Sequence, residues 1–507
     1  MNGDNLLDLI GEARGDYVSR AEKAGKAALK KLRRRKAVGF SALAAACAAV
    51  AVLGGFVGFE MGGNAGSGGL APGESYMFYA GPIMPLSAAS APEGLSLKRN
   101  VNFDFSPYIS VTDDEYERWA DEAIVTDGYV ISNLTENDIT FRGIYPFVGD
   151  LHWKEDRPSI SLNGETVATE LYPGPYAGGF VGVYGDKNDT DGTINLDPYG
   201  SFENYETMLS DGTYMEAAFS EKSDLDIPVT VYRMGEYTYT SDESAEAPTL
   251  CMEFTMDTEK TSILTWNIDG ASNDYETGVF RRHVGGVEFR PNADEAYREP
   301  HSAYIIVVGE DISSYSVQGY KNGGCRKGDE LSDLGCTVTR YETSLGTLVK
   351  ELIAQSPHIE EADKEKLFPL VSELLTTYGP LGEELVQCYD NGRLDDLVSE
   401  AYNHDRVIFA VFEVTVPAGA SVELEAVTLK EASMDYVGKY KERNGYDMAT
   451  GLGSVFEFSA QTASLSGYDE IEIIAQNFGF DTEAGIVSVE LDSAVEHYWL
   501  EVVKIRN

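Results

Sequence analysis

One acidic loop offers the most direct test for chemistry in this sequence. The loop 186–191 (DKNDTD) precedes a glycine, as the alternating oxygen ligands of a helix-loop-helix calcium site do. Counting back from that glycine places Asp191 and Asp189 at ligand positions, but Lys187 replaces the first ligand and Pro198 replaces the bidentate Glu. The helix-loop-helix site is therefore rejected. Two interpretations of the loop are left: a surface calcium site of another kind at Asp189 and Asp191, or a solvated hairpin turn.

The histidines do not form a recognisable metal motif. No two of them have metal-ligand spacing, so the sequence predicts no zinc site; the six are His152, His283, His301, His358, His404 and His497. The sequence has no zinc-protease motif, no nucleophile elbow around a serine and no phosphate-binding Gly-Lys loop. The sequence therefore favours a protein that is not an enzyme, with no assigned catalytic, cofactor-binding or metal residue and no cofactor.

Five cysteines among 507 residues exclude a fold that depends on a disulfide framework. Cys325 and Cys336 flank a Gly-rich, charged stretch, which suits a loop closed by a disulfide or two reduced thiols. Such a short closure would contribute about 3 kcal/mol in the chain-entropy model. Cys251 and Cys388 either pair with each other or are buried thiols.

Tyrosine is abundant, at 30 residues, and clusters with Gly and Pro around Tyr172, Tyr176 and Tyr184. Exposed tyrosines on such loops can contact sugars or peptides, because the ring is apolar and the hydroxyl forms hydrogen bonds. The alternative is ordinary packing of the rings within and along β-sheets.

An apolar run of 23 uncharged residues, Ala37–Phe59, determines on which side of a membrane the other parts of the chain are expected. As a helix it is roughly 34 Å long, enough to cross a hydrocarbon core of about 30 Å. Six Lys/Arg stand between Lys30 and Lys36, directly before the run. By the positive-inside rule, residues 1–36 are expected in the cytoplasm and the chain after Glu60 outside it.

The charge of the chain changes sign at this run. Residues 1–36 carry ten Lys/Arg and five Asp/Glu, a net charge of +5, whereas the remainder carries 29 and 79, a net charge of −50. Nucleic acid is excluded as a partner of the acidic part, because its phosphates need basic patches to neutralise them.

The arrangement of a short cytoplasmic segment, one span and a large outer part is similar to that of membrane-bound anti-sigma factors and related envelope sensors. This resemblance concerns the layout alone. Residues 1–36 contain no His and no Cys, so the zinc-binding motif of many anti-sigma domains is absent. The resemblance implies a cytoplasmic regulator as partner; the alternative is that this segment lies at the anionic inner leaflet.

Short runs of alternating apolar and polar residues between turn signals predict strands from about residue 97 onward. Residues 123–132 and 139–148 are predicted to pair through a turn at 133–138. Asn163-Gly164 and Asp191-Gly192 predict further hairpin turns. Strands at 229–239, 250–255, 262–268, 304–309 and 315–319 continue the pattern.

The hydrophobic period changes between residues 343 and 405, where about three helices are predicted. Strands then return at 407–416 and 422–429, predicted as neighbours across a Pro-Ala-Gly turn, and continue to the end of the sequence. The fold class is mainly β, with two antiparallel β-sandwich (Ig-like) regions and a helical insertion, preceded by one transmembrane helix. The expected divisions are 1–36 cytoplasmic, 37–59 span, 60–96 Gly/Ala/Ser/Pro linker, 97–342 β domain, 343–405 helical insertion and 406–507 C-terminal β-sandwich.

The function expected from these features is a non-enzymatic binding or structural module on a single-pass protein of the cell membrane. Its partners are then the membrane and an unknown envelope ligand or protein. One alternative is an envelope sensor that signals through residues 1–36. A second is an envelope hydrolase, because a pair of catalytic carboxylates carries no local sequence signature.

Overall fold

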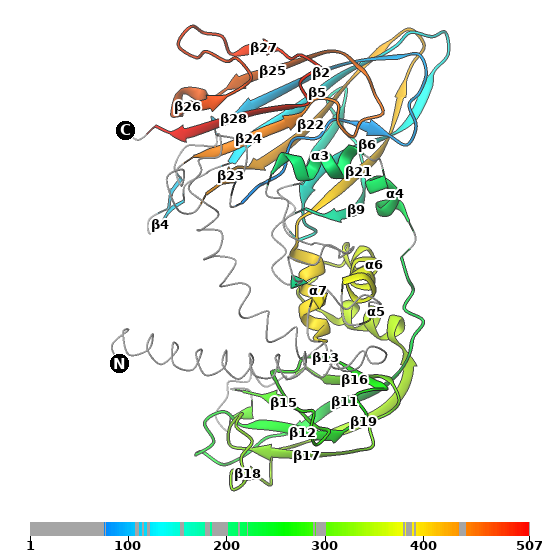
Figure 1. Cartoon of the computed structure of the whole chain (residues 1–507), viewed down its shortest axis with the longest axis vertical. Helices are drawn as coiled ribbons and strands as arrows, with labels where there is room; N and C mark the ends of the chain where they lie inside the picture. Colours follow the sequence, from blue (N-terminus) through cyan, green and yellow to red (C-terminus); the bar gives the residue numbers. More distant parts are fainter. Residues whose placement is uncertain are drawn as a thin grey trace. The chain divides into compact units, whose positions relative to one another are not determined.

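The computed structural model shows a mainly β protein with several antiparallel sheets and few helices (Figure 1). The structure describes residues 76–505 except 77, 107–110, 114–115, 119–121, 153–156, 178–182, 185–200, 211–212, 221, 287–288, 291–300, 379–380, 382–387, 390–391 and 436–442. The described residues fall into two compact units. The first unit lies within Val181–Asn195 and Lys222–Tyr402, and the second within Gly62–Phe180, Leu196–Glu221 and Asn403–Asn507.

Two antiparallel sheets form most of the first unit, with the strand orders β13-β16-β11-β19 and β14-β15-β12-β17-β18. The strands are β11 Pro228–Thr238, β12 Thr249–Thr255, β13 Thr261–Trp266, β14 Gly270–Asp274, β15 Val279–Gly285, β16 Ala303–Gly309, β17 Ser314–Tyr320, β18 Glu330–Leu331 and β19 Gly335–Ser344. A separate short ladder joins β10 Val183–Tyr184 to β20 Cys388–Tyr389. The five strands expected between residues 229 and 319 are thereby confirmed.

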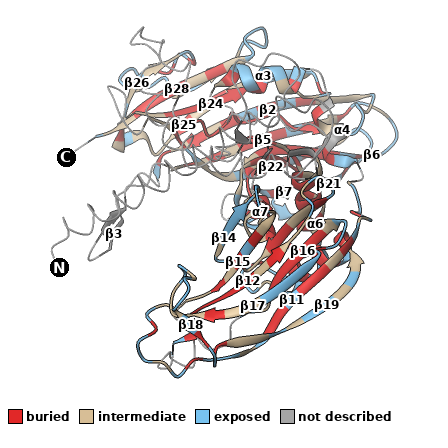
Figure 2. Cartoon of the chain, turned by 60° about the horizontal axis from the view of Figure 1, so that its bottom comes forward, coloured by how far each residue is buried: buried red, intermediate tan, exposed pale blue. Residues whose placement is uncertain are grey.

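The two larger sheets of the first unit share one hydrophobic core. Alternate residues of β12, namely Leu250, Met252 and Phe254, are buried in it. β16 lies between β13 and β11 and is buried from Ala303 to Val307 (Figure 2). Because side chains alternate across a strand, the other residues of β12 point to the opposite face of its sheet.

The helices of the first unit follow β19, within the range predicted for them. They are α5 Leu345–Gln355, α6 Lys364–Glu373, the π-helical turn η5 Leu374–Tyr378 and α7 Leu394–Asn403. Ser344 caps α5, because its hydroxyl accepts a hydrogen bond from the backbone N–H of Thr347. The predicted apolar face of α5 is buried, including Leu345, Leu348 and Leu352.

Three larger sheets form the second unit, with orders β27-β25-β2-β5-β22-β7-β8, β1-β6-β21-β9 and β23-β24-β28-β26, besides the pair β3-β4. β2 and β25 run parallel, and the other ladders are antiparallel. The strands are β1 Ser87–Ala88, β2 Leu95–Asp104, β3 Val111–Asp113, β4 Tyr116–Arg118, β5 Glu122–Asn133, β6 Ile139–Gly149, β7 Ser159–Leu162, β8 Glu165–Thr166, β9 Glu170–Tyr176, β21 Arg406–Val416, β22 Ser421–Glu431, β23 Ser433–Met434, β24 Asn444–Ala449, β25 Phe458–Ser466, β26 Ile471–Gln476, β27 Ser488–Glu490 and β28 His497–Lys504.

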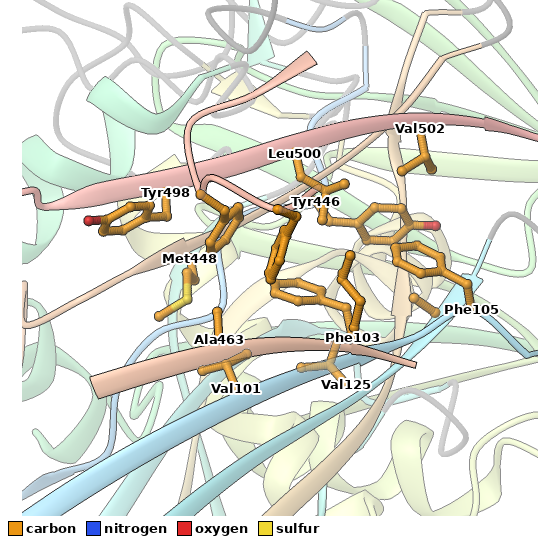
Figure 3. Packing of buried hydrophobic residues seen from close by; sticks show 14 of the residues in the cluster. Val101, Phe103, Phe105, Val125, Tyr446, Met448, Ala463, Tyr498, Leu500 and Val502 are labelled. Carbon is orange, nitrogen blue, oxygen red and sulfur yellow. The ribbon is translucent and has the colours of Figure 1, made fainter. Parts of the chain in front are cut away.

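A second core fills the space between the seven-stranded sheet and the sheet of β24 and β28. Figure 3 shows Phe103 and Val125 pointing toward Leu500 and the other side chains of that sheet. Phe105 meets the ring of Tyr446 edge-on, with the ring centroids 5.4 Å apart. Edge-to-face contacts of this kind add to the stabilisation that burial itself provides.

The predicted pairings across two turns are wrong, although all four strands exist. β5 and β6 do not pair with each other, and neither do β21 and β22; instead β5 pairs with β22 and β6 pairs with β21. The turns contact each other, since the Asn133 side-chain amide donates to Val416 O at 3.0 Å and Gly419 N donates to Thr135 O at 3.1 Å. At each turn the chain therefore passes from one sheet to the other. This arrangement allows neighbouring elements to cover both faces of β21.

The turn at Asn163-Gly164 is confirmed as a hairpin. It joins β7 to β8, and both residues have positive φ values, 52° and 79°. This conformation is the one that two-residue hairpins require and that Asn-Gly adopts at low cost. The turn predicted at Asp191-Gly192 lies outside the described residues.

Two parts of the second unit differ from expectation. The helices α3 Phe202–Ser210 and α4 Thr213–Phe219 occur in a region predicted as strands. The linker predicted for 60–96 is wrong from residue 76 onward, because Met84 and Leu86 are buried and Ile83 forms a β-bridge to Met448. Small residues in this segment allow close packing, which composition alone does not distinguish from a spacer.

The predicted membrane span, the cytoplasmic segment 1–36 and the loop with Asp189 and Asp191 all lie outside the described residues. Within the described part of the chain, no helix is both long and apolar enough to cross a membrane. The division of the chain proposed from the sequence, including the bounds 97–342 and 406–507, stays a prediction.

An ion pair between Arg99 of β2 and Asp127 of β5 is fully buried in the second unit. Arg99 Nε and Nη2 donate to the two oxygens of Asp127 at 2.8 Å each. The hydroxyl of Tyr129 also donates to Asp127, at 2.7 Å, and that of Tyr145 does so at 3.3 Å. Every polar atom of the carboxylate is thus bonded, which offsets the cost of removing it from water.

The same network reaches outside its own sheet. Arg99 Nη1 donates to Ala449 O at 2.6 Å and to Thr450 O at 3.3 Å. The backbone N–H of Leu86 donates to the Tyr129 hydroxyl at 2.8 Å. Burial lowers the pKa of Arg99, but the nearby Asp127 carboxylate more than offsets this, so the pKa is raised and the guanidinium stays charged.

Replacing Asp127 by Asn should destabilise the protein, because it leaves the buried guanidinium of Arg99 without its counter-charge. The expected loss is about 3–5 kcal/mol of unfolding free energy, measured by denaturant titration. Glu170→Gln is the matched control, since its ion pair with Arg142 is solvent-exposed; that change should cost at most about 1 kcal/mol. Equal losses in the two variants would contradict the role given to Asp127.

Candidate metal centre

Two side chains that could bind a metal ion lie side by side where β12 and β15 pair in the first unit. Cys251 of β12 stands directly opposite His283 of β15 in the antiparallel register. The neighbours Leu250 and Met252 point into the core, so Cys251 and His283 share the outer face of the sheet. An added Cβ at Gly270, the residue of β14 opposite His283, would lie 3.3 Å from the ring nitrogen Nδ1. Glycine at this position therefore leaves room for the imidazole.

A loop between β17 and β18 supplies the third side chain. Asn322 forms a turn in this loop, accepting hydrogen bonds from Cys325 N at 3.2 Å and, through its side chain, from Gly324 N at 3.0 Å. Cys325 has a φ of 45°, in the left-handed region that non-glycine residues seldom adopt. Such backbone strain is often found where a side chain must be held in a particular place.

The loop brings Cys325 to the pair on the sheet. The two sulfur atoms and the imidazole nitrogen of His283 all lie within 4.8 Å of one another. Cys251 is buried, whereas His283 and Cys325 are half-buried. The Nε2 atom of His283 is itself buried and has no hydrogen bond of normal geometry to any described residue. The group therefore contains two thiols and one imidazole nitrogen with unused bonding capacity.

The two thiols differ in acidity. The pKa of Cys325 is lowered to about 5, chiefly because the Cys251 thiol can donate a hydrogen bond to its sulfur. Burial opposes this shift, and the nearby His283 ring adds to it. The pKa of Cys251 is raised, first because its proton serves that hydrogen bond and second because it is buried. At neutral pH the pair therefore shares one proton, with the negative charge on Cys325.

The charged groups beside the cluster neutralise each other. Arg281 lies two residues before His283 on β15, and its guanidinium pairs with Glu253 of β12 at 2.6 Å. Glu253 stands directly opposite Arg281 in the same register as Cys251 and His283. The Glu253 carboxylate, which is the neighbouring acidic group, is therefore already engaged in an ion pair with Arg281.

The disulfide considered between Cys325 and Cys336 is not present. Both are free thiols in the structure, as is Cys251. Cys336 lies on β19 and packs against the core, and burial raises its pKa to about 11. Cys251 is the buried thiol that one of the two readings expected, and the side chain of Cys388 is not described.

Sequence spacing gave no indication of this cluster. Its members are separated by 32 and 42 residues, and each comes from a different strand or loop. Only the register of β12 against β15 and the course of the loop after β17 bring them together. Among the described residues this is the one group of three that could hold a metal ion.

Of the other residues singled out in the sequence, Tyr172, Tyr176 and His497 contact neighbouring side chains. The ring of Tyr172 is tilted against that of Phe219, with the centroids 4.7 Å apart, and Tyr176 is buried with the Arg406 guanidinium 3.6 Å from its ring centroid. His497 pairs with Asp447 at 2.9 Å. Packing is thus the role of Tyr172 and Tyr176, while the side chain of Tyr184 lies outside the described residues.

A cavity of about 440 Å³ lies in the second unit, between the helices and the chain before β25. It is lined by Leu209, Ser210, Tyr214, Met215, Thr450, Gly451, Leu452, Gly453, Ser454, Val455, Ser493 and Glu496. Of these twelve residues, Glu496 alone carries a charge. Tyr214 donates a hydrogen bond to Gly453 O at 2.9 Å, and this contact joins α4 to the opposite wall.

Comparison with known proteins finds no family model that matches the chain and no curated protein that is similar to it.

The acidity of Cys325 predicts selective alkylation of the reduced, metal-free protein. Iodoacetamide at pH 7 should modify Cys325 much faster than Cys336, because the first is mainly thiolate and the second mainly thiol. Peptide mass spectrometry measures both rates in one sample. The rate at Cys325 should fall as the pH is lowered through about 5. Similar rates at the two cysteines would contradict the assignment.

Proposed function

We propose that the protein is anchored in the cell membrane by one span and acts outside the cytoplasm as a non-enzymatic binding or structural module of the cell envelope. The observation that carries this proposal is the step at Lys36, where a segment of net charge +5 meets 23 uncharged residues and then a part of net charge −50. This asymmetry supports an orientation with the amino terminus inside. The proposed partners are the membrane and an envelope ligand or protein.

The architecture we propose for the outer part is two β-sandwich (Ig-like) regions with a helical insertion at residues 343–405. Its support is that the main sheets of the first unit share one core, and that two sheets of the second unit share another. Sheets that cover each other in this way present edges and end loops to solvent, where binding residues are commonly placed.

The cavity of the second unit supports binding better than hydrolysis. Glycosidases use two carboxyl groups that lie about 5–9.5 Å apart across the bond to be cleaved. Among the described residues that line the cavity, Glu496 is the single carboxylate. Hydroxyl groups of Ser210, Thr450 and Ser493 line it together with apolar side chains. We infer a neutral or cationic polar ligand of small size.

A protease test in spheroplasts checks the proposed orientation. A membrane-impermeant protease should degrade the chain after residue 60, while an epitope tag fused before Met1 stays protected. The same digestion after detergent treatment is the control, and it should remove the tag as well. Loss of the tag from sealed spheroplasts with survival of the C-terminal part would refute the orientation.

A second candidate is an envelope sensor, which the separate, basic cytoplasmic segment favours. Deleting residues 2–29 keeps the basic run at 30–36 and therefore the orientation. If the segment serves only as an anchor, the transcript profile of cells that carry the deletion should equal that of cells with the full chain. A changed profile, at equal protein abundance in the membrane, would favour the sensor instead.

A further inference from the structure

We propose that Cys251, His283 and Cys325 form a binding site for zinc(II). The inference concerns the first unit alone and does not depend on the membrane anchor or on the cavity of the second unit. Zinc in proteins is commonly bound by thiolate sulfur and imidazole nitrogen in a tetrahedral arrangement, and the cluster offers both types.

The separation of the three ligand atoms suits one ion. Zinc bonds of about 2.0–2.3 Å in a tetrahedron place the ligand atoms roughly 3.3–3.8 Å from one another. The three atoms already lie within 4.8 Å of one another in the structure, which holds no ion. Two of them are fixed by the register of Cys251 against His283, so a small movement of the loop that carries Cys325 completes the triangle.

The second observation is the buried Nε2 atom of His283. A buried polar atom without a hydrogen bond costs free energy, and folded proteins seldom leave one in that state. Nε2 forms no hydrogen bond of normal geometry with any described residue, and a nitrogen of the same ring lies within 4.8 Å of both sulfur atoms. A metal ion between the three groups would accept the lone pair of this nitrogen and remove that cost.

The chemical nature of the three ligands limits which metal ions can bind. Two sulfur ligands exclude hard ions such as magnesium and calcium, which prefer oxygen. Binding releases to solvent the one proton that the two thiols share, and it changes no oxidation state, because zinc has no redox chemistry here. The neighbouring carboxylate of Glu253 is bonded to Arg281, so we assign the fourth position to water.

Because Cys325 lies on a loop, metal binding is expected to affect the stability of the first unit. The loop carries exposed residues such as Gly324, Arg326 and Lys327, and its own contacts are the turn at Asn322 and a few surface bonds. A bound ion would tie this loop to the sheet and so stabilise the first unit. Zinc should accordingly raise the unfolding temperature of the protein.

The test uses the purified full-length protein in detergent, reduced and stripped of metal with a chelator. Zinc is then titrated in competition with a chromogenic chelator, and one zinc ion per chain is expected. Cys325→Ser and His283→Ala should each weaken binding by more than the about 10–100-fold that loss of an outer-shell partner costs. Cys336→Ser is the matched control, since Cys336 is also a free, partly buried thiol, and it should bind zinc normally.

Cobalt(II) provides a readout that does not depend on affinity. The wild type should show thiolate-to-cobalt charge-transfer absorption, and Cys325→Ser should lose part of it while Cys336→Ser keeps it. Cys325 is on a loop, so its substitution leaves the core intact even if Cys251→Ser fails to fold. Zinc binding of equal strength in the wild type and in Cys325→Ser would overturn the proposal.

A disulfide between Cys251 and Cys325 is the competing outcome. Peptide mapping of protein purified without reductant shows whether these two cysteines are linked. A linked pair that binds no zinc after reduction would overturn the proposal, whereas stoichiometric zinc in the reduced protein supports it. Failure of zinc binding leaves the orientation test in spheroplasts unaffected, so the two proposals can fail separately.

Discussion

The second unit is organised around one buried charge pair, Arg99 with Asp127. Neither side chain is exposed, and the network around them joins β2 and β5 to β6 through Tyr145 and to the segment before β1 through Leu86. It also fixes the carbonyl of Thr450, a residue that lines the cavity. A buried pair adds little stability over an apolar core, but an arrangement that separates the two residues leaves a buried charge without a partner, which is strongly destabilising. The pair therefore sets the positions of three sheets and of one cavity wall together.

In the first unit the corresponding constraint is strand register. Cys251 and His283 face each other because β12 and β15 pair in one register, and their neighbours Leu250, Met252 and Val284 belong to the core. A slip of one residue would turn both ligands into the core and expose its apolar side chains. The hydrophobic pattern that holds the sheets together thus also holds the candidate metal centre in place.

Local patterns in the sequence account for most of the elements. The alternation along β11 and β12, the apolar run of β16 and the helical period of α5 are visible in the residues themselves, and these elements form where expected. Pairing between distant strands is not visible in this way. The turn at residues 133–138 resembles a hairpin turn, and only the burial of both faces of β21 explains why the chain changes sheets there. The short helices α3 and α4 carry weak periodicity, and the cluster of Cys251, His283 and Cys325 depends on long-range pairing throughout.

The second unit is built from chain segments that lie before and after the main stretch of the first unit, and this order determines when it can fold. The first unit draws its two main sheets and its three α-helices from the continuous stretch Lys222–Tyr402, so a ribosome can complete it early. β5 and β6 are made long before their ladder partners: β22 begins 288 residues after β5 ends (421 − 133), and β21 begins 257 residues after β6 ends (406 − 149). β5 can pair with β2 and β6 with β1 during that interval, but the other edge of each strand has no native partner yet, a condition that exposes a chain to aggregation. A chain truncated after residue 402 would keep the main sheets of the first unit and leave β5 and β6 of the second without β22 and β21.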